Sequence, residues 1–165
     1  MIGVDFTMND LVRAFRDRIK DYAPLNSWCM TNFGKDLKLG VGTEERQEWG
    51  LEEAPFVQII PTGMNTGMAS SQVSFEFDID LVISKEEIAD SDFINVTEVT
   101  GVYLLDEMVN HVSDVILLMA NDYNAMADDI RIELNSNNFY PLHIASLNVS
   151  VVADQLINGL NTLGG

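Results

Sequence analysis

Residues 73–84 alternate between apolar and polar side chains with a single interruption, at Val82. Successive side chains of a β-strand lie on opposite faces, so this pattern predicts a long strand with one buried face and one acidic face in water. The apolar set is Val73, Phe75, Phe77, Ile79, Leu81 and Ile83, and the polar set is Ser74, Glu76, Asp78, Asp80 and Ser84.

A second apolar segment, residues 55–61, precedes this strand and predicts the other arm of a long hairpin. The eleven residues between the arms, 62–72, carry no charge. Hairpins need only about two to five connecting residues, and longer loops are often functional. The loop is therefore either a mobile surface loop or a docking element. The docking candidates are Gly63, Met64, Asn65, Thr66, Gly67 and Met68.

Two segments predict amphipathic helices. Thr7 and Asp10 have the spacing of a capping box, and apolar residues at helical spacing follow in residues 11–22 until Pro24. Residues 101–120 carry a broad apolar stripe at the same period, with acidic and amide side chains opposite.

Five residues on these helices lie outside the apolar stripes. Arg13, Arg16 and Lys20 gather on the face opposite the stripe of the first helix. Tyr103 and Leu117 lie on the polar side of the second, where either another part of the chain or a partner subunit covers them. The basic group is either a solvated face or a contact surface.

The remaining segments complete the predicted fold. Residues 130–134 and 142–152 alternate as strands, residues 28–33 and 36–40 are read as short strands, and residues 154–165 form a short last helix or an apolar arm.

These elements predict an α+β fold. It has a single, mostly antiparallel β-sheet with a long central hairpin and two helices packed on one face. The length of 165 residues fits one domain spanning 1–165, with residues 154–165 as a C-terminal arm.

The charge is strongly negative and unevenly distributed. The net charge is −17; residues 1–50 hold seven Lys/Arg against eight Asp/Glu, and residues 51–165 hold two against eighteen. Such a chain should repel duplex DNA and anionic membranes. No apolar run approaches the roughly 18 residues of a membrane span, and no signal peptide opens the sequence, so synthesis in the cytoplasm is expected.

The sequence predicts neither an enzyme nor a metal or cofactor site. His111 and His143 lack metal-ligand spacing, and Cys29 lacks basic neighbours that would lower its pKa. One strand face carries three carboxylates in a row, Glu76, Asp78 and Asp80, with about 7 Å between neighbours. A hard cation bridges such carboxylates only if further oxygen ligands are supplied, and no nearby loop supplies them. A solvated acidic face is the expected role.

The order of these segments resembles the tail terminator (tail completion, or neck) proteins of long-tailed bacteriophages. The segments that carry the resemblance are the first helix at residues 11–19, the strand at 54–62, the alternating strand at 73–83, the helix opening at 101–109 and the late strand at 140–151.

The resemblance implies a non-enzymatic virion protein of the tail neck. Members assemble as a ring, commonly a hexamer, that caps the tail tube, ends its polymerisation and offers a docking surface to the head connector. DNA passes through the ring without specific binding. Rival readings are another head–tail adaptor, a small baseplate protein, or a stand-alone acidic binding module.

In such a ring, each candidate group has an expected place. Arg13, Arg16 and Lys20, with Tyr103 and Leu117, are candidates for the subunit interface, because a closed ring joins two different patches of one protein. The acidic row is the candidate channel lining: Glu76, Asp78 and Asp80. The loop at 62–72 is the candidate contact with the tail tube protein.

Overall fold

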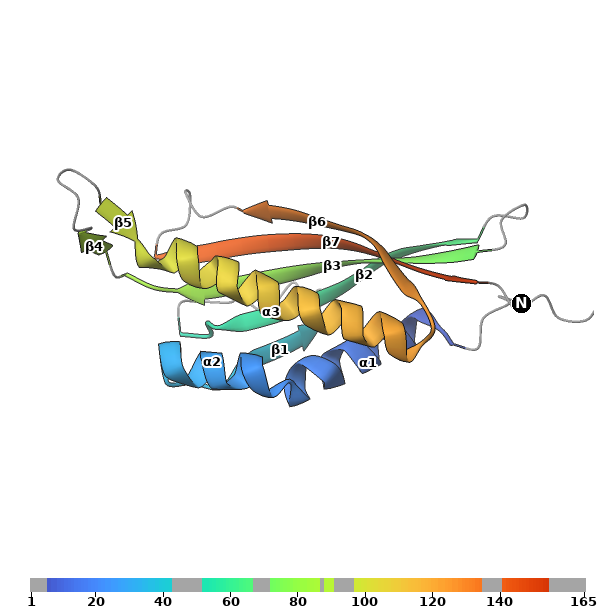
Figure 1. Ribbon diagram of the computed structural model, residues 1–165, viewed down its shortest axis with the longest axis horizontal. Coiled ribbons are helices and arrows are strands. Elements are labelled where there is room, and N and C mark those ends of the chain that lie inside the picture. Colours follow the sequence, from blue (N-terminus) through green and yellow to red (C-terminus); the bar gives the residue numbers. More distant parts are fainter. Residues whose placement is uncertain are drawn as a thin grey trace, which may run out of the picture.

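The computed structural model describes residues 6–42, 52–66, 72–86, 88–90, 97–134 and 141–154. One mixed sheet has the strand order β1-β2-β3-β7-β6, and β4 and β5 form a separate pair (Figure 1). β1 is parallel to β2, and every other neighbouring pair is antiparallel. In chain order the elements are α1 (Met8–Asp21), α2 (Ala23–Phe33), β1 (Lys38–Val41), β2 (Phe56–Thr66), β3 (Gln72–Ser84), β4 (Ile88–Asp90), β5 (Thr97–Val99), α3 (Thr100–Asp122), β6 (Met126–Leu134) and β7 (Leu142–Asp154).

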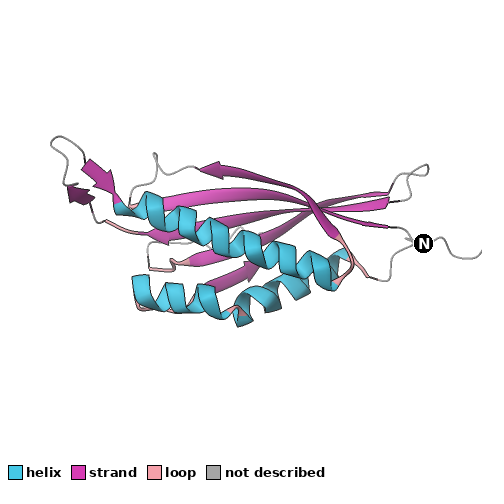
Figure 2. Ribbon diagram, in the orientation of Figure 1, coloured by secondary structure: helices cyan, strands magenta, loops and turns pink. Residues whose placement is uncertain are grey.

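The helices cover one face of the sheet (Figure 2). All six apolar residues of the alternating strand are buried on that face, as are Ala145, Leu147, Val149 and Val151 of β7. The apolar stripe of α3 packs against this face of the sheet and covers the core. Its almost fully buried residues are Leu105, Met108, Val112, Val115, Ile116 and Met119. The predicted α+β class, with one mostly antiparallel sheet around a central hairpin, is confirmed.

The hairpin is confirmed, but the predicted extent of its loop is wrong. β2 continues to Thr66, which pairs with Val73, so residues 62–66 belong to the strand. Gly63 and Asn65 in this segment have low strand propensity. They are nevertheless part of β2, because β3 pairs with them and is itself paired with β7 on its other side. The remaining loop residues, 67–71, lie outside the described residues.

The segment 28–33, predicted as a strand, is the second half of helix α2. Pro24 occupies the first turn of this helix, where its missing N–H costs nothing, and Gly34 ends it in the left-handed conformation (φ 64°). Only Leu25 and Cys29 of α2 are buried, so the sequence shows no broad apolar stripe. Over the described residues, three helices therefore lie on one side of the sheet, where two were predicted.

The start of α1 is as predicted. The side chain of Thr7 accepts a hydrogen bond from the backbone of Asp10, and the Asp10 carboxylate accepts one from the backbone of Thr7. These hydrogen bonds, led by the one from the Thr7 hydroxyl, hold the pKa of Asp10 below its ordinary value. Before the cap, Phe6 packs on Phe75 and Tyr123, with ring centroids 5.3 and 4.9 Å away.

A short strand pair was not predicted, and one prediction needs correction at the end of an element. β4 and β5 pair with each other in the segment before α3. Asp154, assigned to a C-terminal arm, is the last residue of β7 and pairs with Gln72. Residues 155–165 of the predicted arm lie outside the described residues.

Candidate interaction surfaces

The sheet face opposite the helices is acidic over β3, β7 and β6. Register and side-chain alternation place six carboxylates on it and one cation, counted over the described residues of β2, β3, β6 and β7. The carboxylates are Glu76, Asp78, Asp80, Asp129, Glu133 and Asp154, and the cation is Arg131, which pairs with Glu133 at 3.1 Å.

Neutral donors on β7 hold part of the acidic row in place. Asn148 donates its amide to Asp78 at 2.6 Å, and the Ser146 hydroxyl donates to Asp80 at 2.7 Å. No Lys or Arg of the described residues forms an ion pair with Glu76, Asp78 or Asp80. Cross-strand hydrogen bonds from neutral donors therefore hold two of the three carboxylates of the row, Asp78 and Asp80.

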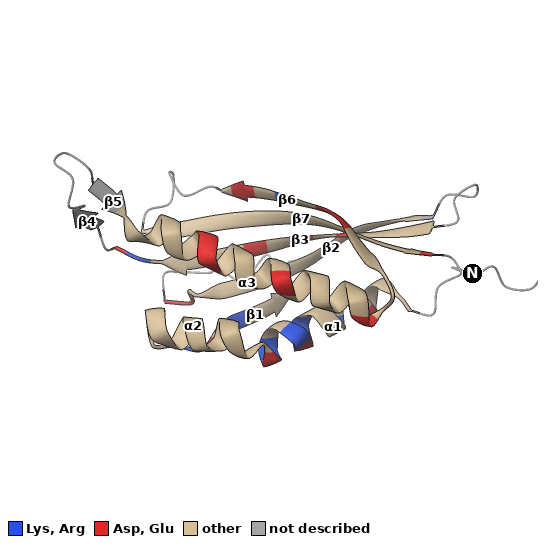
Figure 3. Ribbon diagram, viewed as in Figure 1, with Lys and Arg blue, Asp and Glu red and all other residues tan. Residues whose placement is uncertain are grey.

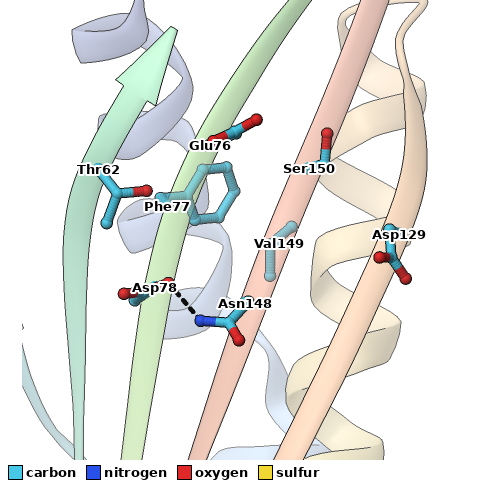
Figure 4. Close-up of a pocket in the computed structure, with 8 residues that line it drawn as sticks. All are labelled: Thr62, Glu76, Phe77, Asp78, Asp129, Asn148, Val149 and Ser150. Atoms are coloured by element: carbon cyan, nitrogen blue, oxygen red, sulfur yellow. Dashed lines mark hydrogen bonds between the residues drawn. The ribbon is translucent and has the colours of Figure 1, made fainter.

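A hollow of about 330 Å³ opens on this face between β2, β3, β7 and β6 (Figure 4). It is lined by Thr62, Glu76, Phe77, Asp78, Asp129, Asn148, Val149 and Ser150. Within the described residues, no three His, Cys, Asp or Glu side chains are grouped so that they would hold a metal ion. Its lining carboxylates, Glu76, Asp78 and Asp129, make it an anionic surface.

A small apolar cluster at one end of the same face explains the interruption at Val82. Val82 is buried with Ala54 and Phe56, and Leu142 and Ile144 pack against them. The polar alternation thus stops where β2, β3 and β7 form a second, minor core on the helix-free face.

The three basic residues proposed as a contact surface are all exposed on α1. Arg16 pairs with Asp17 at 2.7 Å, and both side chains remain about half exposed. Arg18 lies on the other flank of the helix, where its guanidinium donates to Asp122 of α3 at 2.6 and 2.8 Å. Arg13, Arg16 and Lys20 therefore lie on a side of α1 that faces away from α3. Of the three, Lys20 lines a hollow with Leu37 and Leu39 beside β1.

The other predicted contact residues are also exposed where the structure describes them. Tyr103 is 55% and Leu117 48% exposed on α3. At the end of β2, Met64 is 44% exposed, Asn65 is exposed and Gly63 is partly exposed. Thr66 ends the strand, and Gly67 and Met68 lie outside the described residues.

His111 lies among aromatic side chains, and Cys29 is buried. The His111 ring lies 6.1 Å from Trp28 and 6.3 Å from Tyr22, in an aromatic group between α3 and the first two helices. Trp28 donates a hydrogen bond to Glu107 at 2.6 Å, which joins α2 to α3. Burial, with a smaller effect of Asp36, raises the pKa of Cys29 to about 12, which keeps the thiol protonated at neutral pH.

His143 is buried where α3 starts above β7. Its Nε2 lies 3.3 Å from the carbonyl oxygen of Lys85. Gly101 faces the ring so closely that a Cβ at this position would overlap it. The sequence places His143 on the apolar face of a strand but contains no signal that a glycine of the next layer contacts it.

Exposed apolar residues of β6 were not predicted from the sequence. Ile132 is 46% and Leu134 52% exposed, although both lie on the helix-covered face of the sheet. Alternation predicts that they face the core, but it does not reveal that β6 is an edge strand. Strand order, which decides this, depends on long-range pairing.

Comparison with known proteins returns no match, either to a protein-family model or to a curated protein. Among the described helices, none combines the length and the apolar character needed to cross a membrane.

Proposed function

We propose that this chain is a structural virion protein that forms a ring on the end of a bacteriophage tail tube. The ring stops tube polymerisation and offers the surface on which the head connector docks. The order of elements supports this proposal: an N-terminal helix, a long hairpin, a long helix and two final strands, as in the phage tail terminator proteins that the sequence resembles.

The observation that carries the proposal is the helix-free, acidic sheet face. Over the described residues of β2, β3, β6 and β7, six carboxylates against one arginine make a wall that repels phosphate. Phosphate contacts supply nearly all non-specific affinity for DNA. In a ring with the helices outside, this face lines the channel and lets DNA slide past without sticking. The hairpin end, with exposed Met64, then projects beyond the helices and is the candidate contact with the tail tube (Figure 1).

Charge reversal on the acidic row tests this role. Replacing Glu76, Asp78 and Asp80 with lysine should slow DNA ejection, measured on single particles, and leave particle assembly intact. A control with the same number of new lysines places them at Asp106, Asn110 and Asp114, which are exposed on α3. Ejection at the normal rate from the triple variant would count against a channel position.

The mass of the purified protein separates a ring from a stand-alone acidic binding module. A ring former should be oligomeric alone or on tail tubes, whereas a lone module stays at 18.4 kDa under both conditions. Light scattering with and without isolated tail tubes measures this difference.

A further inference from the structure

The five-stranded sheet ends in two edge strands, β1 and β6 (Figure 1). Within the described residues, β1 pairs only with β2, and β6 pairs only with β7. An edge strand presents unpaired N–H and C=O groups that a further strand can satisfy, and proteins usually protect such edges. The outer side of each edge strand is therefore a surface on which another strand can pair.

The two edges differ in their protection. β1 is only four residues long, and Lys38 at its start forms an ion pair with Glu53. β6 is nine residues long. A bulge between Ala127 and Asp129 interrupts its first part, but residues 130–134 keep a regular register with β7. Because short strands and bulges are common forms of edge protection, residues 130–134 are the part of the two edges that remains open.

The open segment alternates between apolar and charged side chains. Its apolar residues lie on the helix-covered face, opposite buried residues of β7, and Ile132 is 46% and Leu134 52% exposed there. Arg131 and Glu133 lie on the helix-free face, and their side chains are 71% and 50% exposed. Charge, mostly acidic, is found along β6 (Figure 3). Both faces of the segment therefore have side chains available for a contact.

The order of these five side chains is self-complementary. We consider two copies whose β6 strands pair antiparallel, with Ile132 of one copy opposite Ile132 of the second. Ile130 is then opposite Leu134, and Arg131 is opposite Glu133, each twice. A two-fold axis through Ile132, perpendicular to the sheet, generates this register and keeps the helices of both copies on the same side. Opposite-charge and apolar cross-strand pairs both stabilise antiparallel strands.

The neighbouring two-fold registers are less favourable. An axis at Arg131 sets this residue against itself and Asp129 against Glu133, and like charges directly opposite each other are destabilising. An axis at Glu133 likewise sets Glu133 against itself. An axis at Ile130 brings the bulge at Asp128 into the pairing, where regular pairing is interrupted.

We propose that two copies of this chain pair through residues 130–134 of β6 and form a two-fold dimer. The pairing joins the two five-stranded sheets into one continuous sheet, with Ile132 on the axis. The interface is isologous, because the same strand of each copy contributes the same residues.

This dimer is a form of the free chain and does not rest on the proposed ring. A ring is closed by head-to-tail contacts between two different patches, whereas this contact joins β6 to itself. The mass in solution tests the dimer, and assembly on tail tubes tests the ring. Either one can therefore fail while the other stands.

Charge exchange between Arg131 and Glu133 tests the register. Arg131→Glu and Glu133→Arg should each require about a tenfold higher concentration to dimerise, because two attractive pairs become two like-charge pairs. Sedimentation velocity over a concentration series measures this shift. An equimolar mixture of the two variants should dimerise at the wild-type concentration, since each contact then joins opposite charges. The double variant, Arg131→Glu with Glu133→Arg, should behave in the same way and is the control for folding.

A cysteine on the axis tests the contact by a different measurement. Opposite residues of an antiparallel pair have Cα atoms about 4.5–5.5 Å apart, which lies within the range of a disulfide. Ile132→Cys should therefore give a disulfide-linked dimer on mild oxidation, seen on a non-reducing gel. Tyr103→Cys is the control, because Tyr103 is similarly exposed but lies on α3. The native Cys29 is buried and should give no cross-link.

Each outcome supports or overturns the pairing. A wild type that moves from 18.4 kDa toward twice this mass, with the pattern of variants above, supports it. A wild type that stays at the mass of one chain at every soluble concentration overturns it. A dimer that both charge variants keep, or that Glu133→Arg alone leaves unchanged, would show another contact or another register. Equal cross-linking of the Ile132→Cys and Tyr103→Cys variants would also overturn it.

Discussion

Replacing Gly101 with alanine should destabilise the fold, although alanine is the better helix former. Gly101 lies in the first turn of α3, against the ring of the buried His143. An added Cβ would lie 2.7 Å from His143 Cε1 and closer still to Nε2 and Cδ2. Contact this close requires the ring or the helix to move, and both are packed into the core.

The magnitude follows from two opposing effects. Overpacking a close-packed site costs about 1–3 kcal/mol, and alanine recovers at most about 1 kcal/mol of helix propensity. Because the added Cβ would lie closer to the ring than real Cβ contacts do, we take the upper part of the overpacking range, about 2–3 kcal/mol, and expect a net loss of about 1–2 kcal/mol in the free energy of unfolding. For a chain of this size, each kcal/mol lowers the melting temperature by roughly 2–4 °C. Urea denaturation followed by circular dichroism measures the loss.

A double variant identifies the cause. His143→Ala in the Gly101→Ala background removes the ring that the new methyl group meets, so the two effects should be non-additive by about 0.5–3 kcal/mol. Gly63→Ala is the control, since a Cβ there meets only Glu76 Oε2 at 3.9 Å. A Gly101→Ala protein as stable as the wild type would show that α3 does not lie on β7 as described.

Three further predictions concern other parts of the chain. Burial raises the pKa of the Cys29 thiol from 9.0 to about 12, so its stabilising contribution is fully present below pH 9 and is lost as pH rises from 9 toward 12. The stability difference between the wild type and Cys29→Ala should therefore shrink across that range in urea titrations, and a constant difference would contradict the assignment. Met64→Asp should abolish binding to isolated tail tubes in a co-sedimentation assay. Met30→Asp should not, because Met30 is similarly exposed but lies on α2. Equal binding by both variants would show that the hairpin end is not the docking element. Trp28→Phe should lower the free energy of unfolding by about 1 kcal/mol through loss of the hydrogen bond to Glu107, and an unchanged value would show that this bond does not hold α2 on α3.

Elements with strong local periodicity were predictable from the sequence. An alternation of two residues indicates a strand and a period of 3.6 residues indicates a helix, so the patterns of β3, β7 and α3 each show which face is buried. The capping box at Thr7 shows where α1 begins. The acidic row was predictable for the same reason. Its position on the helix-free face follows from burial of the opposite, apolar face.

Elements set by tertiary contacts were not predictable. α2 buries only Leu25 and Cys29, so it lacks the stripe that marks a helix. β2 continues to Thr66 because β3 pairs with it, not because its residues favour a strand. The exposure of Ile132 and Leu134 depends on the place of β6 at the sheet edge. The close contact of Gly101 with His143 joins residues of two layers, and no local pattern records it.

The most direct test of the proposed function is the length of phage tails assembled without this chain. Electron microscopy of lysates from the phage with its gene deleted should show tubes of uncontrolled length that carry no head, because nothing ends polymerisation or receives the connector. Supplying the protein in trans should restore one uniform length. Headless tails that are already uniform in length without the chain would contradict the account and assign tail termination to another protein.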